Sequence, residues 1–367
     1  MKQGGELVGL GEGGQTGGMA KAKIALLGAS GFAGAELLRR LLRHPAAEVI
    51  RVVSKDHVGQ NVAAAHLSLE GATDLVFQDL PAAEAIAGAD VVMMGLPVGA
   101  SLEVVAAAEQ SGARIIDMSG AFRVPDAAAF ERYYGAPHPR PELLGQFVYG
   151  LPEQNREKIR GAHWVASPGC FATCIELGLL PLAEAGLLEG SVEVVGITGS
   201  SGAGAVPVAT THHPVRANNL RTYKPLEHAH TPEIVASLSA AGARLSGLHF
   251  VPVSAPLSRG IFATSFVHVP RIASESVLRD LYRRRYANER FVRVPRDRLP
   301  EVVAVSGSPY AEVGLSLGAA TDDKRVLTVF SALDNLIKGG AGQAIQNLNL
   351  MLGIDEATAL DDLGPFP

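Results

Sequence analysis

The 367-residue sequence has only two cysteines, and charged residues make up only 19% of it. Two cysteines cannot build a disulfide framework, so we expect a reducing compartment, with the cytoplasm as the default. The chain also lacks any run of about 18 apolar residues, the length that a membrane-spanning helix requires. A long basic stretch is missing too and the net charge is −5, which argues against a nucleic-acid partner. We therefore expect a protein that binds neither nucleic acid nor membranes and whose partner is a small molecule.

The length and the glycine content indicate more than one domain. A single hydrophobic core stops growing at roughly 250–300 residues, and this chain is longer. A hydrophobic fraction of 47% and 41 glycines are typical of an α/β enzyme with many tight turns. The first residues are too rich in glycine and too poor in apolar side chains to pack, so we expect a flexible extension over residues 1–21, with Met19 as an alternative start.

Strands and helices alternate over residues 22–165. The run KIALLG predicts a buried strand, GASGFAG a turn and AELLRRLLRHP a helix. Further strands are predicted at AEVIRVVS, ADVVMMGLP and ARIIDMS, with the helical pattern SLEVVAAAEQSG between the last two. This alternation predicts a parallel, doubly wound sheet in the first domain.

The pattern changes from about residue 166. The runs VEVVGITGS, HFVPVSAP, IFATSFVHVP and RVLTVFSAL are rich in β-formers and have few helices between them, which predicts an α+β domain with a largely antiparallel sheet over residues 166–332. An apolar face of this sheet is where we expect an interface between copies of the chain. The segment DNLIKGGAGQAIQNLNLMLG has helical periodicity, so we expect residues 333–367 to form a helix that returns to the first domain.

The turn GASGFAG predicts a dinucleotide site. It places Gly28, Gly31 and Gly34 between a strand and a helix, where bare backbone and the unpaired N–H groups of the helix start can bind a pyrophosphate. A turn that only packs tightly is the alternative. The second strand ends in Ser-Lys-Asp at residues 54–56; its hydroxyl and ammonium suit a phosphate and favour NADP(H) over NAD, although Asp56 argues the other way. The expected cofactor contacts here are Gly28, Ser30, Gly31, Phe32, Ala33, Ser54 and Lys55.

Both cysteines lie in the stretch SPGCFATC. Cys170 follows Pro-Gly at the predicted start of a helix, where the helix dipole favours a thiolate, the reactive form. Cys174 lies one turn further along on an apolar face and is expected in the core. A disulfide within one helical turn is disfavoured by geometry, and two thiolates alone do not make a metal site. Cys170 is therefore a candidate nucleophile, with a buried structural cysteine as the alternative.

A catalytic cysteine needs a base, and histidines are the candidates. His228 and His230 occur in LEHAHTPEI, and a spacing of two in an extended segment would aim both imidazoles at the same face. His212 and His213 are further candidates, with an ordinary loop position as the alternative. A zinc site built from these four histidines would lack a recognised ligand spacing, so we expect no metal.

Taken together, these motifs resemble the N-acetyl-γ-glutamyl-phosphate reductases, within the wider semialdehyde dehydrogenase family. The resemblance runs over nearly the whole chain after residue 22 and rests on GASGFAGAELLRRLLRHP, DMSGAFRV, YGLPE, PGCFATC, TGSSGAG, HAHTPEI, PLSRGI and DNLIKGGAGQAIQNLNLMLG, in the family's order. It implies a Rossmann-type NADP-binding domain, a catalytic and oligomerisation domain, and a homotetramer or homodimer.

The resemblance also implies a reaction and the residues that perform it. This reaction is the NADPH-dependent reductive dephosphorylation of an acyl phosphate to an aldehyde and inorganic phosphate, through a thioester on Cys170 and with His228 or His230 as acid and base. Arginine suits the carboxylate and phosphate of such a substrate, with a structural salt bridge as the alternative role. The substrate contacts implied are Arg123, Arg216, Arg221 and Glu233. The further cofactor contacts implied are Gly202, Ala203, Asn335, Lys338 and Gly339, with turn formation and packing as the alternatives.

Three positions depart from the family's usual sequence. Members commonly read NPGC, HRH and a glycine loop that ends in arginine, whereas this chain has Ser167, Ala229 and Ala205 there. The acyl group therefore stays open, with arginine biosynthesis as the first choice. The segment THHPVRANNLRTYKPLEHAH resembles a branch that reduces aminoadipyl phosphate attached to a small acidic carrier protein in lysine biosynthesis. An aspartate-semialdehyde dehydrogenase is the other enzymatic alternative, and an NADP-binding regulatory or structural subunit is the non-enzymatic one.

Overall fold

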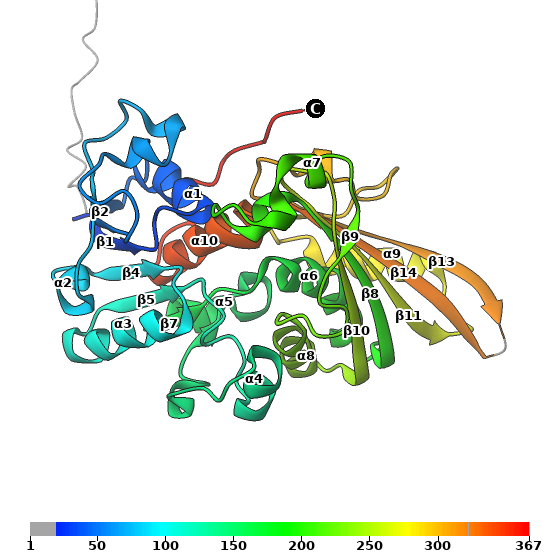
Figure 1. The fold of residues 1–367 in the computed structure, drawn as a ribbon. Coiled ribbons are helices and arrows are strands. Elements are labelled where there is room, and N and C mark those ends of the chain that lie inside the picture. Colours follow the sequence, from blue (N-terminus) through cyan, green and yellow to red (C-terminus); the bar gives the residue numbers. More distant parts are fainter. Residues whose placement is uncertain (1–19, 322, 367) are drawn as a thin grey trace, which may run out of the picture.

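The computed structural model describes residues 20–321 and 323–366. Residues 1–19, which hold most of the predicted extension and the alternative start at Met19, lie outside the described residues. The described chain forms two seven-stranded sheets, and helices pack around and between them (Figure 1).

The first sheet is entirely parallel, as the alternating pattern predicts. Its strand order is β3-β2-β1-β4-β5-β7-β6. The order reverses between β1 and β4, and such a point opens a crevice at the carboxyl ends of the strands. Both strands are buried on both faces over their carboxyl-terminal halves, because each reads as an unbroken apolar run. The strands are β1 (Ala22–Leu27), β2 (Ala47–Val53), β3 (Phe77–Gln78), β4 (Val91–Met94), β5 (Arg114–Asp117), β6 (Val148–Tyr149) and β7 (Trp164–Ala166).

Helices cover both faces of the first sheet. In α1 (Phe32–Leu41), Leu37, Leu38 and Leu41 are buried on one side, and the arginines of the last turn lie where the dipole favours cations. The other helices of this part are α2 (Ala82–Ile86), α3 (Val98–Ser111), α4 (Ala127–Tyr134) and α5 (Pro152–Arg160). Single 3-10 turns occupy Val62–Ala64, Leu67–Leu69 and Pro141–Leu143.

The second sheet is mixed, with four antiparallel and two parallel pairings. Its order is β12-β13-β14-β11-β8-β10-β9. Residues alternate between a buried and an exposed face along β11, where Val267 is buried and Phe266 is 37% exposed. The strands are β8 (Glu189–Thr198), β9 (Arg221–Thr222), β10 (Arg244–Ser254), β11 (Ile261–Pro270), β12 (Val292–Arg293), β13 (Ala311–Thr321) and β14 (Lys324–Leu333).

Three helices pack on the buried face of the second sheet: α6 (Cys170–Glu184), α8 (Thr231–Ala240) and α9 (Glu275–Tyr286). A short helix, α7 (His213–Arg216), lies in the long connection between β8 and β9. Single 3-10 turns occupy Ser200–Ala203, Ala209–Thr211 and Val302–Ala304. Among the described residues, no helix combines the length and the apolar character needed to cross a membrane.

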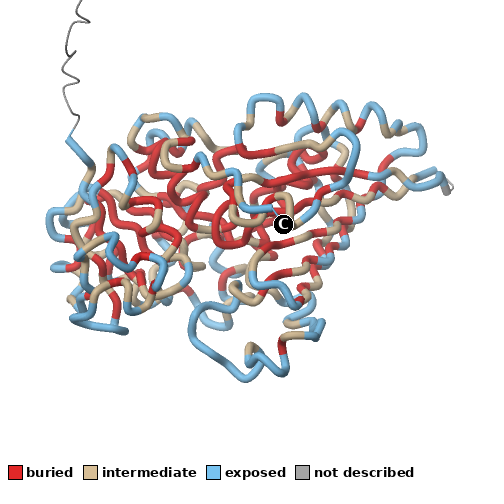
Figure 2. Tube along the Cα trace, turned by 90° about the horizontal axis from the view of Figure 1, so that it is seen from above, coloured by how far each residue is buried: buried red, intermediate tan, exposed pale blue. Residues whose placement is uncertain are grey.

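The chain ends by returning to the first sheet. A π-helical turn, Ile337–Ala341, leads into α10 (Gly342–Met351), whose residues are all buried. Helix α10 packs against α1, α5 and β5, and Ile345 and Leu348 share a core cluster with Ile24 of β1. Figure 1 shows α10 beside α1, although the two are far apart in the sequence, and Figure 2 shows buried backbone running through the middle of the molecule.

Candidate active site

The glycine turn after β1 is shaped for a ligand. Gly28 has a φ of +76°, and a Cβ on it would lie 2.5 Å from the carbonyl oxygen of Gly95, the residue that follows β4. Gly31 is the N-cap of α1 and supplies no capping side chain, so the first N–H groups of the helix face the cavity unpaired. This donor set fits the pyrophosphate of a dinucleotide.

The end of β2 differs in part from the prediction. The Ser54 hydroxyl is buried: it donates to Ser30 Oγ at 2.9 Å and accepts the Asp56 amide at 3.0 Å, so it serves the turn itself. Ser30 Oγ in turn donates to the Asp56 carboxylate at 3.2 Å. Lys55 is exposed. Of the two groups predicted to meet a 2′-phosphate, the ammonium of Lys55 is the exposed one.

Cys170 is the first residue of α6, with Gly169 as N-cap, which confirms the predicted helix start. It is half-buried and lines the same cavity as the glycine turn. Cys174 is 1% exposed, belongs to the core cluster of the second sheet and donates to Ser331 Oγ at 3.4 Å, so the prediction of a core residue is confirmed.

Burial of Cys170 opposes the predicted stabilisation of its thiolate. Burial raises the pKa of the Cys170 thiol to about 11, although Arg123 and the backbone amide of Phe171 act in the opposite direction. Removing the sulfur from water therefore outweighs the helix dipole. A base near the sulfur is needed before it can attack.

His228 and His230 line the cavity beside Cys170, but they do not lie on an extended segment, the condition under which a spacing of two would aim both rings at one face. They lie in the turn before α8, where the His230 amide donates to His228 Nδ1 at 3.1 Å and the ring centroids are 4.6 Å apart. Burial lowers the pKa of His228 to about 4 and that of His230 well below its usual value, so both rings are neutral at pH 7. His212 and His213 lie at the start of α7 and do not line this cavity.

The ring of His230 lies directly against the backbone before the nucleophile. A Cβ on Gly169 would come within 2.3 Å of His230 Nε2. A Cβ on Gly339 would come within 2.8 Å of the Cys170 Cβ from the opposite direction. The absence of a side chain at Gly169 and Gly339 thus leaves room for His230 and Cys170. A larger residue at Gly169 would displace the histidine, and one at Gly339 would displace the cysteine.

Glu233 and Arg123 form a buried pair behind this turn. Glu233 is 1% exposed and accepts the Gly169 amide at 3.1 Å; its Oε1 lies 3.7 Å from Arg123 Nη1 and 3.9 Å from His230 Nε2. Arg123 donates to the carbonyl oxygens of Ser167 at 2.7 Å and Met118 at 2.6 Å and also lines the cavity. Glu233 itself lines a different cavity and contacts the Cys170 turn through the Gly169 amide.

The second glycine loop and the C-terminal segment close the cavity. Asn335 accepts the Gly260 amide at 2.8 Å and donates to Ser201 Oγ at 3.0 Å, which fixes the loop. Gly202 lines the cavity, and Ala203 faces a neighbouring one.

The structure gives Lys338 a different place from the predicted one. Its ammonium is 1% exposed, bonded to Glu153 at 2.6 Å and to Gln346 Oε1 at 2.8 Å. Because a buried cation needs a partner, this pair ties the π-helical turn to α5. Lys338 does not line the Cys170 cavity, so the predicted cofactor contact is not present, and its hydrogen-bond partners are Glu153 and Gln346.

Arg216 and Arg221 line a neighbouring cavity of about 220 Å³. Arg216 is 9% exposed, contacts Ser254 Oγ and the carbonyl oxygen of Thr198, and leaves Nε without a hydrogen-bond partner among the described residues. Arg221 is exposed on β9. Thr198, Gly202 and Tyr223 line both this cavity and that of Cys170, so the two adjoin.

One cavity of about 440 Å³ thus joins the nucleotide turn to the cysteine and the histidines. Of the predicted contacts, it brings together Gly28, Gly31, Phe32, Ala33, Arg123, Cys170, Gly202, His228, His230, Asn335 and Gly339. The predicted contacts outside its walls are Ser30, Ser54, Lys55, Ala203, Arg216, Arg221, Glu233 and Lys338.

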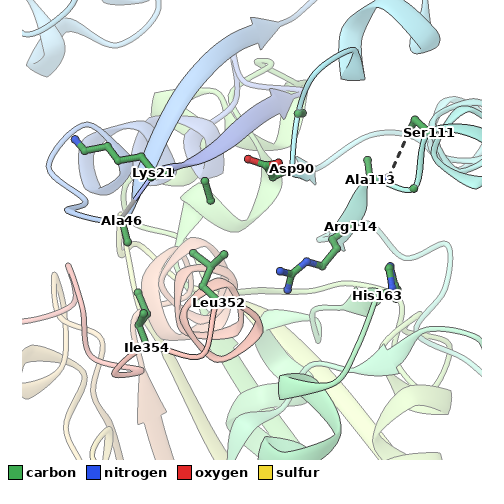
Figure 3. A pocket seen from close by; sticks show the side chains of 13 residues that line it. Lys21, Ala46, Asp90, Ser111, Ala113, Arg114, His163, Leu352 and Ile354 are labelled. Carbon is green, nitrogen blue, oxygen red and sulfur yellow. Dashed lines mark hydrogen bonds between the residues drawn. The ribbon is translucent and has the colours of Figure 1, made fainter. Parts of the chain in front are cut away.

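A second cavity, of about 530 Å³, lies at the amino-terminal ends of the central strands of the first sheet (Figure 3). It is lined where β1, β4 and β5 begin, by side chains that include Lys21, Asp90, Arg114 and His163. It contains none of the predicted site residues, and Arg114 donates to the Met351 carbonyl oxygen at 2.5 Å. Within residues 20–321 and 323–366, no group of three or more His, Cys, Asp or Glu residues is arranged to hold a metal ion.

The sequence reasoning missed two site residues, Tyr149 and Glu176. The Tyr149 hydroxyl oxygen lies 2.8 Å from a Glu176 carboxylate oxygen and 2.9 Å from one of Glu233. Tyr149 stands in the motif YGLPE, and Glu176 is the lone acid in the apolar first turns of α6. An acidic residue within an apolar helical run was the sequence feature that could have indicated Glu176.

Comparisons with known proteins agree with this geometry. The model of the semialdehyde dehydrogenase NAD-binding domain matches residues 23–162, and that of the semialdehyde dehydrogenase dimerisation domain matches residues 170–335. The chain belongs to the semialdehyde dehydrogenase family. The first match covers the glycine turn, and the second begins at Cys170.

Relatives within the semialdehyde dehydrogenases carry two different names. An N-acetyl-gamma-glutamyl-phosphate reductase of Methanosphaera stadtmanae is 41% identical over 95% of this chain and 100% of its own length. A LysW-L-2-aminoadipate 6-phosphate reductase of Deinococcus radiodurans is 40% identical over 95% of this chain and 99% of its own. The solved structure of aspartate semialdehyde dehydrogenase II from Vibrio cholerae has a TM-score of 0.66 at 15% identity and covers 91% of this chain and 99% of that one, a likeness of fold alone.

Proposed function

We propose that the protein reduces N-acetyl-γ-glutamyl phosphate to N-acetylglutamate 5-semialdehyde and inorganic phosphate, with NADPH as the reductant, in arginine biosynthesis. One observation carries the proposal: Cys170, at the start of α6, shares a cavity with the glycine turn of a dinucleotide site and with two neutral histidines. A nucleophile and a hydride donor have to meet at one carbon, and this cavity is where both fit.

Cys170 acts as the nucleophile. Its sulfur attacks the acyl carbon; the C–S bond forms as the C–O bond to phosphate breaks, which releases inorganic phosphate and leaves a thioester. When bound at the glycine turn, NADPH would supply a hydride to the thioester carbon. The C–S bond of the hemithioacetal then breaks, the aldehyde leaves, and the Cys170 thiolate takes back the proton that the neighbouring histidine had removed.

We assign the acid–base role to His230 rather than His228. His228 Nδ1 already accepts the His230 amide, whereas His230 Nδ1 is buried without a hydrogen-bond partner among the described residues. A neutral imidazole beside a thiol with a pKa of about 11 can take the sulfur's proton as the substrate binds. His228 then holds the backbone of its neighbour.

We propose NADP(H) as the cofactor. Lys55 is exposed at the end of β2, beside the turn that binds the pyrophosphate, and an ammonium there suits a 2′-phosphate. Asp56, which favours a free ribose hydroxyl, accepts the Ser30 hydroxyl and is thus engaged within the protein.

The second candidate substrate is aminoadipyl phosphate linked to a small acidic carrier protein. Two features favour it: the name of the relative from Deinococcus radiodurans and the cavity of Arg216 and Arg221, which adjoins the nucleophile. Arg221 and Lys224 are exposed and suit an acidic partner. In either case, Arg216 is proposed to bind the far carboxylate of the acyl group.

The test is the reverse reaction, followed as phosphate-dependent reduction of NADP⁺. N-acetylglutamate semialdehyde, the carrier-linked aminoadipate semialdehyde and aspartate semialdehyde are offered in turn, and fastest turnover with the first supports the proposal. Preference for the second or third aldehyde would replace the substrate. Turnover with none of them would leave a nucleotide-binding subunit without this chemistry.

Cys170→Ser and Cys174→Ser are the matched pair of controls. We expect no turnover and intact NADPH binding for Cys170→Ser, and turnover with lowered stability for Cys174→Ser, because Cys174 is core. Equal activity of Cys170→Ser and the wild type would exclude the covalent mechanism.

We further propose a homodimer or homotetramer that forms through the open face of the second sheet. Along this face, Val195 is 38% and Phe266 is 37% exposed, on the side opposite the covering helices. Sedimentation of the purified protein tests the proposal. The cytoplasmic location stays a prediction.

A further inference from the structure

A chain of three hydrogen-bonded groups lies behind the Cys170 turn: two buried carboxyl groups and, between them, the hydroxyl of the half-buried Tyr149. Glu176 of α6 is 0% and Glu233 of α8 1% exposed, and both contact the single hydroxyl of Tyr149, at 2.8 and 2.9 Å. Glu233 also accepts the amide of Gly169, directly before the nucleophile, at 3.1 Å. The chain therefore links Glu176 to the backbone of the reactive turn.

The number of protons that Glu176, Tyr149 and Glu233 can share determines which of them is protonated. A phenol has one proton and can donate to only one of the two carboxyl groups. If both were carboxylates, the second contact would place an acceptor against an acceptor in a water-poor interior, which is strongly unfavourable. One carboxyl group must hold a proton and donate it to the Tyr149 oxygen.

Glu176 is the group that holds the proton. Glu233 has Arg123 Nη1 at 3.7 Å and a backbone amide as donor, and both stabilise a negative charge. Glu176 has no ion pair, and its Oε2 has no hydrogen-bond partner within the described chain. The charged or titratable groups that face Glu176 are Tyr149, Glu233 and Arg123. In agreement, burial and then the charge of Glu233 raise the pKa of Glu176 well above its usual value, although hydrogen bonds from Tyr149 and Ser237 act in the opposite direction. Burial also raises the pKa of Glu233, but there Arg123 is the first of the opposing causes, and burial keeps Tyr149 protonated.

We propose that Glu176, held as a neutral carboxylic acid, is a positioning residue: it donates to Tyr149, Tyr149 donates to Glu233, and Glu233 holds the Gly169 amide. The positioning role of Glu176 in catalysis rests on the proposed function, whereas the protonation of Glu176 does not. Without the donor at Glu176, the oxygen of Tyr149 loses one of the two contacts that fix its position, and the support of the turn is weakened.

The first test reads the proton directly. Infrared difference spectra between the wild type and Glu176→Gln at neutral pH should show the loss of a carboxylic-acid carbonyl band. The loss of carboxylate bands alone would overturn the proposal. This spectrum needs neither substrate nor turnover, so it stands apart from the outcome of the reverse reaction.

The second test reads the positioning through the reactivity of Cys170 toward iodoacetamide, as a function of pH and without ligands. Glu176→Gln keeps one donor and should stay within about twofold of the wild type. Glu176→Met and Tyr149→Phe should each change the rate about tenfold, the effect expected when a buried acceptor loses its donor. The double variant Glu176→Met/Tyr149→Phe should add nothing further, because both changes break the same chain.

Two results would refute the positioning role. One is that Glu176→Met behaves like Glu176→Gln, which is what filling of space alone predicts. The other is that the effects of Glu176→Met and Tyr149→Phe simply add. If Glu176→Met does not fold, Tyr149→Phe and the infrared band still decide the proposal.

Discussion

Gly169→Ala is the substitution that tests the architecture around Cys170 most sharply. The new Cβ would lie 2.3 Å from His230 Nε2, whereas ordinary van der Waals contact begins at 3.4 Å, so about 1 Å of movement is required. The histidine cannot give way easily, because its ring centroid lies 4.6 Å from that of His228 and 6.3 Å from that of Phe171, with Glu233 on a third side.

A displacement of this size has two consequences. A misplacement of about 1 Å near the reacting atoms costs about 100-fold in rate. Overpacking a close-packed region costs about 1–3 kcal/mol of stability. We therefore expect kcat to fall about 100-fold while the protein still folds, because the glycine adopts no conformation that alanine is denied.

The assay is kcat in the phosphate-dependent reverse reaction, alongside NADPH affinity and the thermal midpoint. Gly161→Ala is the matched control, since its Cβ would meet no atom closer than 4.0 Å and should leave all three quantities unchanged. If Gly169→Ala kept kcat within threefold of the wild type, His230 would not act from the position described. A loss of NADPH affinity equal to the loss of kcat would place the damage in the nucleotide turn instead.

Three further predictions concern the cofactor, the pH dependence and the buried ion pair. Lys55→Ala should raise KM for NADPH about tenfold and leave KM for NADH unchanged, as measured in parallel titrations; an equal change for both would exclude contact with a 2′-phosphate. Burial lowers the pKa of His228 from 6.5 to about 4, so between these pH values the unfolded chain takes up a proton and the folded one does not. Acidification across this window should therefore lower the free energy of unfolding by up to about 3 kcal/mol. Urea midpoints should fall less steeply with pH for His228→Gln than for the wild type. Lys338→Met should lower the free energy of unfolding by about 3–5 kcal/mol, because it leaves Glu153 buried without a partner, and Lys338→Met/Glu153→Leu should restore most of this loss. If Lys338→Met instead kept full stability and bound NADPH weakly, Lys338 would be a cofactor contact after all.

Local patterns were sufficient for much of the fold and for the nucleophile. The turn at Gly28, the apolar strands and the helix that starts at Cys170 are set by short-range sequence, because strand periodicity and helix starts act over a few residues. The prediction for His228 and His230 reached the right cavity for the wrong reason, since the residues lie in a turn and not in a strand.

Properties that depend on distant parts of the chain could not be predicted. The helix dipole at Cys170 is visible in the sequence, but the burial that outweighs it is not. Lys338 finds Glu153 across 185 residues, and Tyr149 meets Glu176 and Glu233 only after two domains have packed. The pairing of charged groups in a core is a tertiary property, and periodicity carries no information about it.

The burial of α10 in the first sheet's core also determines when that domain can be completed during synthesis. Helix α10 is made long after β1 and α1, yet it shares their core. At roughly 5–20 residues per second, the early strands wait tens of seconds for their last helix. Over that time the apolar surface of Ile24, Leu37 and Leu38 lacks the part of its core that α10 supplies.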